Sequence, residues 1–336
     1  LVLTQQLVKK YPEEKEAWFM LAGATGGPMC NPLKAISFHE KWLQLDPLFK
    51  VGYPWIIRDC MSLGLFEEGK KYALKYLEIA PNDAVAHHHM GYVYFFQGKP
   101  ELALDEFQRA LELDPNYYDA VIGISQTLAL QGKFPESLDK LARLVSEQFA
   151  PIHRIGAYYQ LGFNALAQGK FERALDYLKK MIRVMETYHV DFMLPFGHNY
   201  LGLLYYFVSN LSEARREFEY VVANPGIIRG YYGYGISNYL LGIVAVEEAR
   251  FADAKNMAGK TQQIAEGEDN SIFREWYEDL TAQIKFGQDQ RYAATHKVKG
   301  FYLVGWWVWM NEIFIPREWF LAQIFERRDQ IETAIQ

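Results

Sequence analysis

The sequence has few cysteines. Cys30 and Cys60 are the only two in 336 residues, and neither belongs to a cysteine or Cys/His pair at zinc spacing. A framework of disulfides needs several cysteines, and a structural zinc site needs four ligands at short, regular spacings. The sequence therefore supports neither of them, and we expect no metal site and no cofactor.

The chain also lacks an excess of positive charge and a long apolar run. The net charge of -6 offers no basic surface that could release counterions from nucleic acid, so we expect no nucleic-acid partner. The apolar run from Gly300 to Met310 is broken by Asn311 and Glu312, and a helix that spans a bilayer needs about 20 residues. No signal peptide is visible at the start, LVLTQQLVKKYP, which leaves the compartment open with the cytoplasm slightly favoured.

Catalytic motifs are missing as well. No Gly-x-Ser-x-Gly elbow occurs, and His39-Glu40 lacks the second histidine of a zinc-protease helix. The stretch AKNMAGKT, residues 254–261, fits a relaxed phosphate-loop pattern, but such a loop follows a strand, whereas YLLGIVAVEEARF before it is typical of a helix. We therefore predict that the chain is not an enzyme and has no catalytic residues.

The sequence does contain a short phrase that recurs at a fixed interval. LQLDP ends at Pro47, LEIAP at Pro81 and LELDP at Pro115, which are 34 residues apart. Between the last two prolines, the pattern predicts a helix, a glycine-containing turn and a second helix, each with one apolar stripe. One such hairpin cannot bury its own apolar face, so successive hairpins are expected to stack.

This pattern resembles the tetratricopeptide repeat family, in which the first helix (helix A) has a small residue near its middle and the second (helix B) carries alanine, an aromatic residue and alanine. The unit before Pro115 supplies Gly91, Ala103, Phe107 and Ala110 at these positions. Seven units can be aligned over residues 14–270, and their central positions are Ala22, Ile57, Gly91, Ser125, Gly162, Gly202 and Gly242. The resemblance implies an all-α fold, a right-handed superhelical solenoid of antiparallel helix hairpins with a C-terminal helical cap.

The predicted organisation has three parts. Residues 1–13 fit helix B of a preceding repeat, residues 14–270 form the array, and residues 271–336 hold a degenerate repeat followed by a tryptophan-rich segment. The later repeats are longer, and we expect their extra residues to lie in extended helix B ends and loops between repeats. The tryptophan-rich segment is either a cap or a docking face for a subunit or a membrane, with Trp306, Trp307, Trp309 and Trp319 as its anchors.

Three consecutive histidines, His87 to His89, raise the question of a metal site. Consecutive helical residues diverge by about 100°, so three in a row do not converge on one ion. We expect His87 to point into the hairpin and His88 to point to the opposite, concave side.

The resemblance also implies a binding groove, lined by helix A residues at fixed offsets from the central small residue. These offsets select His88, Tyr92, Phe95, Phe96, Gln126, Tyr159, Phe163, Asn199, Tyr206, Phe207 and Tyr239. The lining is mainly apolar, and no unit supplies the set of lysine and asparagine side chains with which chaperone-binding members hold a peptide carboxylate. The predicted partner is an apolar or helical protein segment, and whether the groove is open or filled by the chain itself is left open.

The sequence therefore favours a non-enzymatic scaffold for protein-protein interaction. One alternative is a regulatory or sensor arm of a larger enzyme or transcription regulator. The other is a self-assembling repeat protein, a homo-oligomer in which the N-terminal half-repeat of one copy stacks on the tryptophan-rich segment of another.

Overall fold

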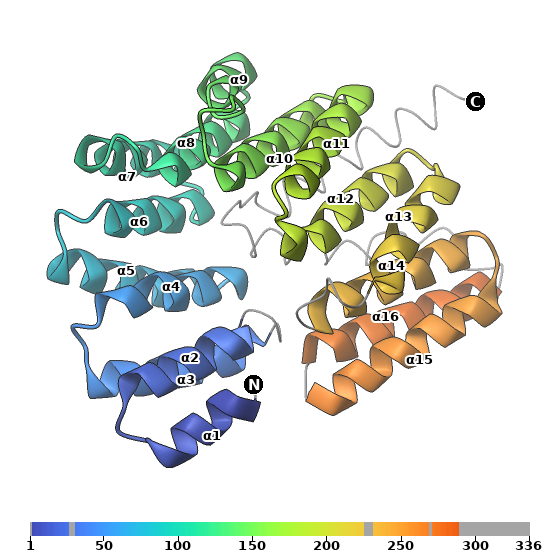
Figure 1. Ribbon diagram of the computed structural model, residues 1–336, viewed down its shortest axis with the longest axis horizontal. Helices are drawn as coiled ribbons and strands as arrows, with labels where there is room; N and C mark the ends of the chain where they lie inside the picture. The colour runs from blue at the N-terminus through green and yellow to red at the C-terminus, as the bar shows by residue number, and fades with distance from the viewer. Residues whose placement is uncertain (1, 27–30, 225–230, 269–270, 289–336) are drawn as a thin grey trace. The chain divides into compact units, whose positions relative to one another are not determined.

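The computed structural model describes residues 2–26, 31–224, 231–268 and 271–288, and these residues form helices without any strand (Figure 1). The all-α prediction is confirmed. The α-helices are α1 Val2–Lys10, α2 Lys15–Gly26, α3 Pro32–Leu45, α4 Tyr53–Ser62, α5 Phe66–Ile79, α6 Ala84–Phe96, α7 Pro100–Leu113, α8 Tyr118–Leu130, α9 Phe134–Ala142, α10 Pro151–Ala167, α11 Phe171–Thr187, α12 Leu194–Phe207, α13 Leu211–Ala223, α14 Tyr231–Glu247, α15 Phe251–Glu268 and α16 Ser271–Gln288. Two short 3-10 helices, η1 Lys50–Gly52 and η2 Asp191–Met193, precede α4 and α12.

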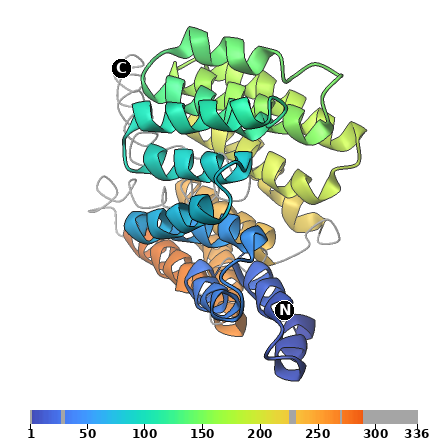
Figure 2. The ribbon, with the colours of Figure 1, turned by 90° about the vertical axis from the view of Figure 1, so that its left-hand side faces the viewer.

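The helices form hairpins in chain order. Each predicted unit is one pair, from α2 with α3 to α14 with α15, so that even-numbered helices are A helices and odd-numbered helices are B helices. Contacts divide the chain into two compact units, of which the first contains α1 to α9 and the second α10 to α16. Within the first unit, each hairpin packs on the next and α6 contacts α4 and α8, as the stack in Figure 2 shows.

The central small residue of helix A is explained by an aromatic ring on helix B. Phe107 of α7 is completely buried, and a Cβ atom at Gly91 of α6 would lie 2.6 Å from its ring. The same ring also faces Gly123 of α8 in the next hairpin, where a Cβ would again lie 2.6 Å away. Phe107 thus joins two repeats, and the absence of side chains at both glycines gives it the space.

In the hairpins from α4 with α5 to α14 with α15, the turn between helices A and B has one residue with positive φ. Glycine supplies it at Gly98, with φ of 68°, where the N–H of Lys99 donates to the carbonyl of Tyr94 and closes the helix end. In the last hairpin, Ala249 takes the corresponding place with φ of 57°. A side chain with a Cβ atom is disfavoured in this conformation.

Replacing Ala249 by glycine is therefore expected to stabilise the second unit by about 1 kcal/mol. Thermal unfolding followed by circular dichroism measures the change. Gly98→Ala is the matched variant in the other direction, and it should destabilise the first unit by a similar amount. A lower melting temperature for Ala249→Gly would contradict this explanation of the turn.

Some of the later repeats have longer helices, although α12 with 14 residues and α13 with 13 do not. α10, α11 and α14 have 17 residues each and α15 has 18, compared with 13 in α6 and 14 in α7. Part of the extra length extends helix B, as α11 shows. Loops contribute as predicted, since residues 143–150 connect α9 to α10 whereas only residues 114–117 connect α7 to α8, but residues 151–154 belong to helix α10 and not to a loop.

Other sequence predictions concern the ends of the array. The stretch AKNMAGKT lies inside α15, where the Thr261 hydroxyl donates to the carbonyl of Met257, so its backbone is helical and does not form a phosphate-binding loop. Helix α16, Ser271–Gln288, follows the seventh hairpin and lies where the sequence predicted a degenerate repeat. Trp306, Trp307, Trp309 and Trp319 lie outside the described residues, and within those residues no helix is long and apolar enough to cross a membrane.

Candidate functional site: the A-helix face

We use the name A-helix face for the side chains that the sequence predicted to line a groove, and we describe each unit separately. In the first unit, α6 contributes His88, Tyr92, Phe95 and Phe96, and α8 contributes Gln126. The ring centroids of His88 and Tyr92 are 4.6 Å apart, and Tyr92 lies 5.3 Å from Phe107 of the core. Phe96 is half-buried, whereas the other four side chains are buried.

His88 lies deeper than the sequence predicted. Its side chain was expected to point away from the hairpin, but its ring centroid is 5.7 Å from that of Phe107 on α7 and 5.0 Å from that of Tyr117. Burial, and then the neighbouring His89, hold the pKa of His88 well below its usual value, so the imidazole is neutral at neutral pH. Among the described residues, neither of its ring nitrogens has a hydrogen-bond partner.

The other two histidines have partners of their own. Nδ1 of His87 is 2.7 Å from a carboxylate oxygen of Glu106 on α7, which agrees with its predicted direction, and Nδ1 of His89 is 2.9 Å from the carbonyl oxygen of Val85. The same pairing recurs in the second unit between His198 and Glu217, also at 2.7 Å. Within the described part of the chain, no group of three histidine, cysteine or acidic side chains could hold a metal ion.

Gln126 on α8 is the second polar residue of the first unit's A-helix face. Its side chain is 2 % exposed, and neither its amide nitrogen nor its amide oxygen has a hydrogen-bond partner among the described residues. Because α6 and α8 are in contact, the face combines aromatic rings with two buried polar groups that the described helices leave unsatisfied.

In the second unit, the polar atoms of the A-helix face link successive hairpins. The hydroxyl of Tyr159 on α10 donates to that of Tyr200 on α12 at 2.7 Å, and burial raises the pKa of Tyr159 far above its usual value. The hydroxyl of Ser237 on α14 donates to Oδ1 of Asn199 at 2.8 Å. These bonds hold neighbouring A helices in register.

The remaining predicted residues of the second unit differ in exposure. Phe163 is buried beside Tyr159, with 4.6 Å between ring centroids, and the hydroxyl of Tyr239 donates to Asp279 on α16 at 2.5 Å. Tyr206 and Phe207, at the end of α12, are only half-buried. The accessible part of the A-helix face is therefore Phe96 in the first unit and Tyr206 with Phe207 in the second, and a binding role for any of them stays a prediction.

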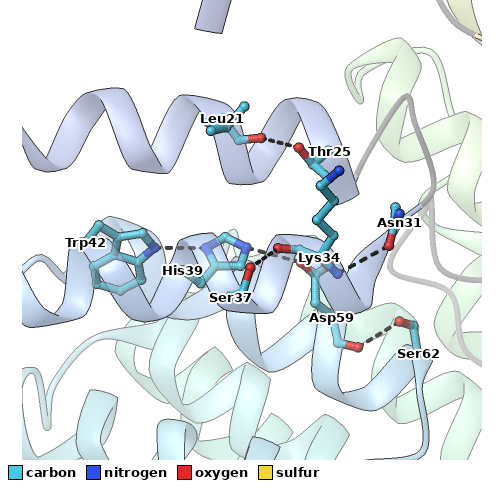
Figure 3. A network of polar contacts seen from close by, with 9 residues as sticks. All are labelled: Leu21, Thr25, Asn31, Lys34, Ser37, His39, Trp42, Asp59 and Ser62. Atoms are coloured by element: carbon cyan, nitrogen blue, oxygen red, sulfur yellow. Dashed lines mark hydrogen bonds and ion pairs between the residues drawn. The ribbon is translucent and has the colours of Figure 1, made fainter. Parts of the chain in front are cut away.

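A buried polar network at the contact between α3 and α4 was not predicted (Figure 3). Nε1–H of Trp42 donates to Nδ1 of His39 at 2.8 Å, and Nε2 of His39 is 3.1 Å from Oδ2 of Asp59. Because Nδ1 accepts, the neutral imidazole carries its proton on Nε2 and donates it to the carboxylate. Desolvation raises the pKa of Asp59, and the hydrogen bond from His39 opposes that rise.

All three members of this network are buried, so it is placed to hold two repeats together and not to contact a ligand. In the sequence, His39 was notable only as part of an incomplete zinc-protease motif. A spacing pattern within one helix cannot predict that Asp59 is the partner of His39, because Asp59 belongs to the next hairpin.

Comparison with known proteins shows a likeness in one hairpin and in part of the chain. The sequence profile of the tetratricopeptide repeat matches residues 84–117, the hairpin of α6 and α7. The type IV pilus assembly protein PilF of Pseudomonas aeruginosa is 26 % identical over 154 residues, which cover 46 % of this chain and 58 % of PilF. The chain thus spans just over half the length of this relative.

Solved structures resemble the chain as well. A chain in the crystal structure of the APC/C hetero-tetramer Cut9-Hcn1 has a TM-score of 0.50 and 15 % identity, over 94 % of this chain and 56 % of that one. The solved structure of Pseudomonas aeruginosa PilF has a TM-score of 0.43 and 20 % identity, over 70 % of this chain and 97 % of its own. The first likeness supports the solenoid fold. The matched repeat and the seven consecutive helix hairpins agree with the predicted resemblance of this chain to tetratricopeptide repeat proteins.

Proposed function

We propose that the chain is a non-enzymatic scaffold that binds an apolar or helical segment of a partner protein on its A-helix face. Proteins built from tetratricopeptide repeats generally mediate protein-protein interactions, and this supports the class of function. The observation that carries the finer proposal is the set of aromatic side chains on the A helices, of which Phe96, Tyr206 and Phe207 retain accessible surface.

The chemistry of this face favours an apolar partner. A half-buried aromatic ring loses its remaining contact with water when an apolar side chain packs on it, which contributes favourable binding energy. The selected positions include no lysine or arginine, the side chains that would hold a carboxylate or phosphate group of a ligand. An amphipathic helix that presents apolar side chains along one face fits such a surface.

Replacing Phe96 by serine is expected to weaken partner capture about tenfold or more, because full burial of a phenylalanine side chain is worth about 1.5 to 3 kcal/mol. Quantitative capture from the native cell extract, with bound proteins identified by mass spectrometry, measures the change. Circular dichroism should show the same helix content as the unmodified chain.

Leu102→Ser is the matched control for this experiment. Leu102 lies on α7, the B helix of the same hairpin, and its side chain is 44 % exposed. Capture should survive this change. Equal capture by the Phe96→Ser variant and the unmodified chain would remove the A-helix face from the proposal, and equal loss in both variants would point to the B helices.

A further inference from the structure

We propose that His88 makes the contact between the third hairpin, α6 with α7, and the fourth hairpin, α8 with α9, sensitive to acid. The His88 side chain is buried where these two hairpins meet, and its ring fits there only while it carries no charge. Uptake of a proton by this ring loosens the packing of α6, α7 and α8. Partner binding on the A-helix face is not required for this response.

The ring of His88 lies at the joint between the two hairpins. Its centroid is 5.7 Å from that of Phe107 on α7 and 5.0 Å from that of Tyr117, the residue directly before α8. Phe107 in turn fills the space beside Gly123 of α8, where an added Cβ atom would lie 2.6 Å from its ring. A displacement of the His88 ring therefore disturbs side chains that pack α8 against the third hairpin.

The surroundings of His88 suit a neutral imidazole and not an imidazolium. The side chain is 0 % exposed, and neither Nδ1 nor Nε2 has a hydrogen-bond partner among the described residues. A neutral imidazole has one N–H donor, whereas an imidazolium has two donors and a full positive charge. Burial of an unpaired charge costs far more free energy than burial of an unpaired polar group. The folded array therefore disfavours the protonated ring.

The side chains around this ring bring no carboxylate that could stabilise a positive charge. The ring contacts of His88 are with aromatic side chains, namely His89 and Tyr92 on α6, Phe107 on α7 and Tyr117 before α8. The carboxylate of Glu106 on α7 lies instead against His87, 2.7 Å from its Nδ1. On the other side of α6, α4 and α5 pack against apolar side chains, those of Ala86, Met90 and Val93.

The difference between the folded and the unfolded chain sets the direction of the pH effect. A histidine in the unfolded chain has a pKa of about 6.5, whereas burial, and then His89, hold the pKa of folded His88 well below that value. The stability that the neutral ring contributes is therefore complete above about pH 6.5 and is lost as the pH falls below it. In this range, each pH unit raises the equilibrium constant for opening about tenfold.

Hydrogen exchange of the full chain at pH 7 and pH 5, corrected for the intrinsic pH dependence of amide exchange, tests the proposal. In the unmodified chain, we expect the fraction of open molecules reported by peptides from α6 and α8 to be about tenfold or more higher at pH 5. The same open fraction at both pH values would overturn the proposal without any variant.

Two substitutions assign the response to one side chain. His88→Phe keeps an aromatic ring but cannot take up a proton, so the rise at pH 5 should fall to about threefold or less, and His88→Leu should behave in the same way. His87→Gln is the matched control, because His87 lies against Glu106 outside the ring cluster, and it should retain the rise of about tenfold or more. A rise in either His88 variant that equals the rise in the unmodified chain would overturn the proposal.

Discussion

Replacing His39 by leucine is expected to lower the free energy of unfolding of the first unit by about 3 to 5 kcal/mol at neutral pH. The change leaves the carboxylate of Asp59 buried without its hydrogen-bond donor, and it also removes the acceptor of the Trp42 indole N–H. Breaking one side of a buried pair is costly because the remaining charge has no compensation.

The size of this defect should depend on pH in a defined direction. Desolvation raises the pKa of Asp59 in the folded chain above its ordinary value of 3.8. For an acid with a raised pKa, the stability contribution is present below the unfolded pKa and is lost as the pH rises through the folded pKa. The His39→Leu defect should therefore shrink as the pH falls from neutral toward 4, as Asp59 takes up a proton.

Asp59→Asn is the matched control. The asparagine side-chain oxygen can still accept from Nε2–H of His39, and no buried charge remains, so stability at neutral pH should stay within about 1 kcal/mol of the unmodified chain. Urea denaturation at pH 7 and pH 5, followed by circular dichroism, measures both variants. Equal losses in the two variants, or no loss for His39→Leu, would contradict the account of this network.

Replacing Phe107 by alanine is expected to cost about 3 to 5 kcal/mol. The ring is completely buried and occupies the space that Gly91 and Gly123 leave on the two neighbouring A helices. Those glycines have no side chains that could move into the cavity. Leu102→Ala, on the same helix but 44 % exposed, should change stability by no more than about 0.5 kcal/mol.

The effect of Phe107→Ala should also be local. In a repeat array each hairpin contacts mainly its neighbours, so loosening should spread through adjacent hairpins only. Hydrogen exchange should therefore speed up in α6, α7 and α8 and stay unchanged in α14 and α15. Uniformly faster exchange in both units would show that the chain unfolds as one cooperative body.

The hairpins could be predicted from the sequence because their determinants are local. The spacing from Gly91 to Phe107 fixes which positions face each other within one hairpin, and Gly98 marks the turn between the helices. The recurrence of such positions was sufficient to place seven A helices and seven B helices. Local patterns give weaker evidence on where a helix begins or ends, which is why the early start of α10 was missed.

The state of the candidate site could not be predicted in the same way. The offsets taken from the family select a side of helix A, but the burial of a side chain depends on what packs against that side. Tyr159 was selected as a groove residue, and its hydroxyl instead bonds to Tyr200 of the next A helix. The pairing of His39 with Asp59 likewise depends on how two hairpins stack, which no single repeat encodes.

The most direct test of the account is whether a partner contacts the A helices or the B helices of the second unit. p-Benzoylphenylalanine is placed in the full chain at Phe207, on the A-helix face of α12, or at Tyr220 on the B helix α13, which is 36 % exposed. After capture of a partner and irradiation, the account predicts that the partner cross-links from position 207 and not from position 220. Cross-links from position 220 alone would contradict it.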